Sequence, residues 1–371
     1  MPTPQRISAL DGLRGIAILS VVAFHYFWRW INEGYQVQNT LLSPVFHYGY
    51  MGVELFFIIS GYVIFMTLEN CKNVGEFLLR RWIRLWPAMF FGSLLIFAMA
   101  FLIPGYPFTK EPIDLLPGLA FISPVELHDI FGLQTHHLDG AFWSMFVEVK
   151  FYLLAGLLYF TVQRWTAAIL VSLVAIRLLL LYSLRIDTAF MPTTAQTWDA
   201  VLVLKSLPWF CIGIIVYQLQ KKQSVLFNTF LLFFALAETV ETPAYEESAL
   251  VRLVVCGIFL LPFVNKAFER LLSWRGLVFV GLISYPLYLI HENIGVATMQ
   301  WVKGFAPVWV SQWIGLPLAV VMIGAAYLIW QHLEKPAQAW LKGKLLRKKE
   351  PTMTVLPAAK EPNPKDKVFQ A

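Results

Sequence analysis

The chain has 371 residues, of which 58% are hydrophobic, 16% aromatic and only 14% charged. Because about a quarter of the residues in a soluble domain are charged, this composition excludes an ordinary soluble protein and predicts an integral membrane protein, with the lipid bilayer as a partner. The formal net charge of +6 does not indicate nucleic-acid binding, since the basic residues are scattered at the ends of apolar runs and gathered after Pro336, as membrane topology requires.

Taken in chain order, the apolar runs predict about ten membrane-spanning helices, because each is close to the length that crosses a hydrocarbon core of roughly 30 Å. The predicted spans cover residues 14–31, 50–68, 86–103, 141–162, 166–184, 201–219, 225–240, 249–265, 279–300 and 311–332. The expected fold is therefore an all-α, polytopic transmembrane bundle formed by residues 1–340. The basic, proline-rich segment 341–371 is expected to be a disordered tail, because it has few large apolar residues.

The loops between these runs predict the orientation. Residues 113–123 are interrupted by Pro117 and are expected to be an interfacial or re-entrant segment rather than an eleventh span. With ten spans, basic loop residues fall on one side of the membrane and acidic ones on the other, so the positive-inside rule places both termini in the cytoplasm. The basic set includes Arg80, Arg81, Arg164, Lys221 and Arg270, and the acidic set includes Glu111, Asp129, Asp187, Glu246 and Glu247.

Four of the ionisable residues inside predicted spans come from four different helices and lie at comparable depths. A charged side chain near the bilayer centre costs at least ~2.5 kcal/mol and therefore tends to face a bundle interior or a water-filled cavity. The direction of each span places all four in the outer half of the membrane, where we expect them to gather as a functional set. They are His25, Glu54, Glu148 and His291.

Arginines gather at the opposite level. Arg14 precedes His25 by eleven residues, about three helical turns, so the two side chains project from one face about 16 Å apart. At the level of Arg14, the segment RRWIRLWP places Arg80, Arg81 and Arg84 just before the third span. Guanidinium groups bind phosphate oxygens in a bidentate way, so this cluster predicts a site for an anionic, nucleotide-like ligand.

This arrangement suits an acyl thioester of coenzyme A, held by its phosphates at the cytoplasmic face with its pantetheine arm reaching into the membrane. A histidine there could deprotonate an acceptor hydroxyl, with a carboxylate orienting the imidazole. A proton-coupled transporter is the alternative, in which His25 and Glu148 form a proton relay and the arginines an anion gate. No repeat typical of transporters is visible in the sequence.

Other reactive side chains fit structural or solvated positions. Cys71, Cys211 and Cys256 have no CxxC spacing and are expected to pack in or beside apolar runs. His136 and His137 are adjacent on a loop and make a poor ligand set, so no metal is expected.

Six motifs in sequence order, between about residues 8 and 336, resemble the acyltransferase 3 superfamily of integral-membrane acyltransferases. They are LDGLRGIAILSVVAFH, GVELFFIISGYVI, RRWIRLWP, WSMFVEVKFYLL, SYPLYLIH and LEKP. The resemblance implies a ten-helix fold in a bacterial inner membrane and the use of cytoplasmic acyl-CoA, commonly acetyl-CoA, to acylate sugar hydroxyls in extracytoplasmic glycans or lipid-linked precursors. It also implies that His25 is catalytic, that Arg14, Arg81 and Arg84 serve the donor, and that Glu148 belongs to the functional set.

Overall fold

The computed structural model describes residues 7–108, 111–183, 200–241 and 249–346. Within these ranges the chain forms helices and no strand, which confirms the predicted all-α class. The first half of the chain contains α1 (Ser8–Phe24), α2 (Ser43–Phe46), α3 (Gly52–Leu68), α4 (Val74–Leu102), α5 (Leu115–Ala120), α6 (Pro124–Phe131), α7 (Trp143–Val162) and α8 (Thr166–Ser183). The second half contains α10 (Leu207–Gln220), α11 (Val225–Glu241), α12 (Ala249–Val264), α13 (Lys266–Leu272), α14 (Arg275–Leu282), α15 (Ser284–Ile290), α16 (Glu292–Lys303), α17 (Val308–Trp313), α18 (Gly315–Ile329) and α19 (Lys335–Leu345).

Five helical stretches within these residues are long and apolar enough to cross a membrane, so the chain is a multi-pass membrane protein. They are Ser8–Arg29, Ser43–Leu68, Val74–Leu102, Gly140–Leu180 and Gly315–Leu345. Helices α12 and α13 bend by 108° relative to each other and would make a sixth if they form one span. The other predicted spans are shorter or broken: α10 has only 14 residues, and the predicted span 279–300 is divided among α14, α15 and α16. The prediction that the chain crosses the membrane ten times is therefore kept as a proposal.

Helix α4 begins earlier than the sequence predicts. Asn73 caps its first turn, with its side-chain oxygen accepting a hydrogen bond from the backbone N–H of Glu76 at 2.9 Å, a typical way to satisfy a helix N-terminus. The helix then continues through Pro87 to Leu102. Arg80, Arg81 and Arg84 therefore lie on a helix, which fixes the direction of each side chain.

Two other predicted regions differ from the sequence reading in detail. In the predicted re-entrant segment 113–123, α5 packs on α4 and ends at Phe121. Helix α19 continues past residue 340 to Leu345, so the domain extends slightly into the predicted tail. The rest of that tail, after residue 346, and the acidic loop residues Asp187, Glu246 and Glu247 lie outside the described residues.

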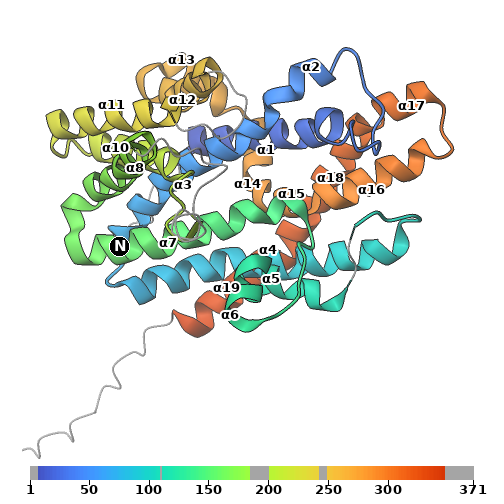
Figure 1. Cartoon of the computed structure of the whole chain (residues 1–371), viewed down its shortest axis with the longest axis horizontal. Helices are drawn as coiled ribbons and strands as arrows, with labels where there is room; N and C mark the ends of the chain where they lie inside the picture. Colours follow the sequence, from blue (N-terminus) through green and yellow to red (C-terminus); the bar gives the residue numbers. More distant parts are fainter. Residues whose placement is uncertain (1–6, 109–110, 184–199, 242–248, 347–371) are drawn as a thin grey trace, which may run out of the picture.

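Helices α1, α3 and α15 contribute Arg14, Glu54, Ser60, Ser284 and Tyr288 to the site described below. α1 packs on α3 and α14, α3 packs on α10, and α15 lies between α4 and α18. Figure 1 shows α10 to α13 at one end of the molecule and α16 to α18 at the other, with α1 running between them. Segments far apart in sequence thus meet around α1 and α15.

The contact between α3 and α10 depends on two glycines. A Cβ atom at Gly213 would lie 1.9 Å from the carbonyl oxygen of Ile58, and one at Gly61 would lie 2.1 Å from that of Phe210. These separations are far below van der Waals contact, so any side chain would push the two backbones apart.

We expect Gly213→Val to lower the free energy of unfolding by at least about 1–3 kcal/mol through this overpacking, measured as a lower melting temperature of the detergent-solubilised protein. Gly257→Val is the matched control, because no atom lies within 4 Å of the added Cβ there. Equal melting temperatures for the two variants would contradict the close α3–α10 contact.

Candidate active site

A large cavity lies where the end of α1, the start of α3 and the junction of α15 and α16 meet. It holds about 910 Å³, which is within the range of pockets that bind small molecules. We call it the histidine cavity, because His25 lines it together with Glu54 and Glu292. Half of its other lining residues are Phe, Trp or Tyr; they are Phe24, Trp28, Trp30, Tyr48, Tyr50, Phe108, Trp143 and Tyr288.

His25 is paired with a carboxylate in this cavity. It is the first residue of a π-helical turn, His25–Arg29, that follows α1. Its Nδ1 atom lies 3.2 Å from Oε1 of Glu292, and the two side chains are only 13% and 5% exposed. A carboxylate that accepts the Nδ1 proton orients the ring and leaves Nε2 available to accept another proton. His25 therefore has the geometry of a general base.

His291 supports the same imidazole from the side. Its ring centroid lies 5.0 Å from that of His25 in an edge-to-face arrangement, and the residue is fully buried. The Nδ1 atom of His291 lies 2.8 Å from the carbonyl oxygen of Tyr288. The carbonyl oxygen of His291 accepts a hydrogen bond from the Tyr26 hydroxyl at 2.9 Å. These contacts fix His291 against the backbone and hold it beside His25.

Asp139 anchors the start of α16, which carries Glu292. One carboxylate oxygen of Asp139 accepts from the backbone N–H of Asn293 at 3.0 Å, and the other accepts from that of Ala141 at 2.9 Å. The Asn293 side chain donates to the carbonyl of Leu138 at 2.9 Å. Because Asn293 follows Glu292 directly, these bonds position the carboxylate that meets His25.

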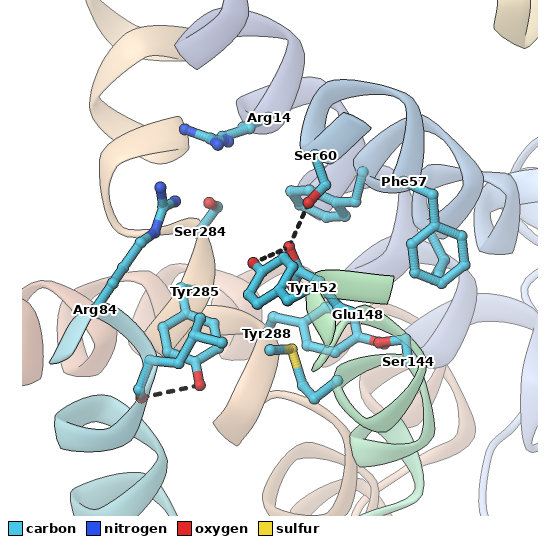
Figure 2. A pocket seen from close by; sticks show the side chains of 14 residues that line it. Arg14, Phe57, Ser60, Arg84, Ser144, Glu148, Tyr152, Ser284, Tyr285 and Tyr288 are labelled. Carbon is cyan, nitrogen blue, oxygen red and sulfur yellow. Dashed lines mark hydrogen bonds between the residues drawn. The ribbon is translucent and has the colours of Figure 1, made fainter. Parts of the chain in front are cut away.

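A smaller cavity of about 70 Å³ lies deeper along α1 and is lined by Arg14 and Arg84; we call it the arginine cavity. Figure 2 shows the two guanidinium groups facing the same space, with Ser284 between them. The two positive charges repel each other, so an anion bound between them would relieve this repulsion. Gln338 donates to the carbonyl of Arg84 at 2.9 Å and ties that turn of α4 to α19.

Glu148 lines the arginine cavity and is held by two hydroxyl groups. Its Oε1 atom accepts from Ser60 at 2.6 Å and from Tyr152 at 2.5 Å, the two bonds drawn at the centre of Figure 2. Its negative charge attracts the guanidinium of Arg14. The ion pair of Arg14 is formed with Asp11, with 3.6 Å between Nη1 and Oδ1, and Glu148 adds negative charge on the cavity side.

The other two predicted arginines lie outside both cavity walls. Arg81 is buried, donates to the Thr67 hydroxyl and lies 5.6 Å from the ring centroid of Tyr152. Arg80 is exposed and paired with Glu76, with 2.6 Å between Nη2 and Oε1. Arg81 therefore supports Tyr152 from behind, and Arg80 lies on the surface.

The four predicted intramembrane residues divide between the two cavities. Of these, His25 and Glu54 line the histidine cavity, and the ring of His291 contacts that of His25. Glu148 lies in the arginine cavity instead, which corrects the expected single cluster. The reason is that Ser144, one turn before Glu148 on α7, already lies at the boundary between the cavities, where its hydroxyl meets that of Tyr288 at 2.7 Å.

Sequence reasoning missed Glu292 and the boundary role of Tyr288. Glu292 follows His291 in the motif-bearing stretch SYPLYLIHEN, and its charge inside a predicted span was a usable signal. The sequence did not show that the helix breaks at His291, which lets Glu292 begin a new helix. Among the described residues, no group of three or more His, Cys, Asp or Glu side chains is arranged to hold a metal ion.

Comparisons with known proteins identify the family of the chain. The family model of the acyltransferase 3 domain, described as "Acyltransferase domain", matches residues 7–331, so the chain belongs to the acyltransferase 3 family. It is therefore a member of a family of enzymes that transfer acyl groups.

Two relatives from Staphylococcus aureus are similar to it over most of its length. A protein of strain COL named "Putative O-acetyltransferase SACOL0978" is 25% identical over 89% of this chain and 57% of its own length. The O-acetyltransferase OatA of strain NCTC 8325 / PS 47 is 24% identical over 84% of this chain and 54% of its own length. The chain thus spans about half the length of the curated relatives it matches. Among solved structures, none matches it.

Proposed function

We propose that the chain is a membrane-bound O-acyltransferase that moves an acetyl group from cytoplasmic acetyl-CoA to a hydroxyl of an extracytoplasmic carbohydrate or glycolipid. The observation that carries the proposal is the buried His25–Glu292 pair in a ligand-sized cavity, next to a cavity lined by Arg14 and Arg84. A base poised beside a site for an anionic donor is what acyl transfer from a coenzyme A thioester needs. The relatives named as O-acetyltransferases favour acetyl as the acyl group.

The donor is assigned to the arginine cavity. Arg14 and Arg84 would bind phosphate oxygens of the coenzyme, since guanidinium groups form short, charge-assisted hydrogen bonds with phosphate. Glu148 would keep Arg14 oriented, and Arg81 would support the Tyr152 hydroxyl that holds Glu148. The thioester arm would then extend along α1 toward His25.

In the transfer step, Nε2 of His25 removes the proton from the acceptor hydroxyl while its Nδ1 faces Glu292. The hydroxyl oxygen attacks the thioester carbonyl carbon, a new C–O ester bond forms and the C–S bond breaks. The coenzyme leaves as a thiolate, which takes up the proton held by His25. Glu292 stabilises the imidazolium that exists between the two proton transfers, and His291 keeps the ring in place.

The histidine cavity is assigned to the acceptor. Its aromatic wall offers flat apolar faces to a sugar ring, and the half-buried Glu54 adds an acceptor for hydroxyl groups. In this proposal the chain has ten spans, both termini are cytoplasmic, and it modifies polysaccharide of the cell envelope from the inner membrane of a bacterium. This orientation follows from the basic loops on the side of Arg14.

We expect His25→Ala to lower acyl transfer on the order of 10²–10⁴-fold, the usual contribution of a general base. The measurement is label transferred from labelled acetyl-CoA to glycans and glycolipids of membrane vesicles that contain the variant. His128→Ala is the matched control, because that histidine lies on the exposed helix α6 and pairs only with the exposed Asp129 among the described residues. Transfer by His25→Ala at the unaltered rate would remove His25 from the mechanism.

Arg84→Ala should raise the KM for acetyl-CoA about ten- to a hundredfold, because one charge-assisted hydrogen bond contributes ~1.5–3 kcal/mol. Steady-state rates in the same vesicles at varied acetyl-CoA concentration measure it. Arg80→Ala, one turn earlier on α4 and directed to the surface, should leave KM unchanged. A lower kcat with unaltered KM in Arg84→Ala would contradict the donor role.

A further inference from the structure

Two side chains separate the arginine cavity from the histidine cavity. Val53 of α3 and Tyr288 of α15 line both cavities, and both are buried. If the donor binds at Arg14 and Arg84 and the base is His25, the acyl group has to pass between these two side chains. The inference below therefore rests on the proposed function.

The Tyr288 side of this passage is held by hydrogen bonds. The tyrosine hydroxyl donates to the carbonyl of Ala141 at 3.0 Å and lies 2.7 Å from the hydroxyl of Ser144. Its ring contacts Phe56, a residue of the arginine-cavity wall, at 6.1 Å between centroids. On the other side the ring lies 5.6 Å from that of His291. Tyr288 thus bridges the two cavities in a fixed orientation.

The Val53 side is fixed by the backbone. The preceding residue, Gly52, lies so close to α1 that a Cβ atom there would be 2.3 Å from the carbonyl oxygen of Ala17. The side chain of Val21 is also within 2.9 Å of that position, so α3 is closely packed on α1 here and has no room to move toward it. The width available to an acyl group therefore depends on the size of the side chain at position 53 and on the position of the Tyr288 ring.

We propose that Val53 and Tyr288 form a constriction that selects the acyl group by size and favours acetyl over longer chains. In this proposal an acetyl group fits between the two side chains, and each further methylene meets Val53, Tyr288 or the adjoining Phe56. The selectivity lies in the passage, separate from the phosphate-binding arginines and from His25.

The test compares acetyl-, propionyl- and butyryl-CoA as donors in membrane vesicles that contain each variant, and measures acyl groups transferred to vesicle glycans and glycolipids. Val53→Ala should raise the propionyl-to-acetyl ratio of kcat/KM about tenfold or more, because one methylene in an apolar site is discriminated by about 10–200-fold. Val53→Ile should lower the same ratio. Tyr288→Phe, which keeps the ring but loses both hydroxyl contacts, should raise it.

Val63→Ala is the matched control. Val63 lies on the same helix as Val53 and packs against the core, but it lines neither cavity. Val63→Ala should therefore show the same propionyl-to-acetyl ratio of kcat/KM as the unmodified chain. Val53→Ile also protects the test against poor folding of Val53→Ala, because it predicts the opposite change without creating a void.

The outcomes separate this inference from the function on which it rests. The unmodified chain could transfer acetyl groups while Val53→Ala, Val53→Ile and Tyr288→Phe all keep its propionyl-to-acetyl ratio of kcat/KM. That result would overturn the constriction and leave the proposed acyltransferase function standing. The same ratio change in Val63→Ala as in Val53→Ala would also overturn it, since the effect would then be general. No transfer of any acyl group by the unmodified chain would instead overturn the proposed function.

Discussion

The contact between His25 and Glu292 is the interaction on which the site depends, because each group would be costly to bury alone. An isolated ionised side chain in a low-dielectric interior loses its hydration, and a partner within hydrogen-bond distance offsets that loss. The helix is interrupted at His291, between α15 and α16, and the first turn of α16 is tied to Asp139 through the backbone N–H of Asn293. The broken helix is therefore part of the site.

In the proposed function, the same geometry separates donor binding from proton transfer along α1 and the turn that follows it. α1 carries Arg14 in the arginine cavity, and the π-helical turn after it carries His25 in the histidine cavity. Helix α3 packs on α1 and contributes Ser60 to the arginine cavity and Glu54 to the histidine cavity. Donor and acceptor would thus approach His25 from opposite ends of the bundle.

Much of this could be predicted from the sequence because membrane burial makes ionisable residues conspicuous. The all-α class, the shared placement of His25 and Glu54, and the arginines Arg14 and Arg84 at one end all follow from apolar runs and helical spacing. The pairing of His25 with Glu292 was missed because it depends on the interruption of a single predicted span at His291, although the charge of Glu292 inside that span was a signal. Likewise, spacing alone did not show that Arg81 turns toward Thr67 while Arg84 faces the cavity.

The most direct test of transfer between the two cavities is the side of the membrane on which the product forms. Inside-out vesicles containing the chain would be given labelled acetyl-CoA from outside and then an esterase that cannot cross the membrane. We expect labelled acetyl esters to be protected from the esterase until detergent is added, because the acceptor would lie in the lumen. Labelled esters that the esterase removes without detergent would contradict transfer across the membrane.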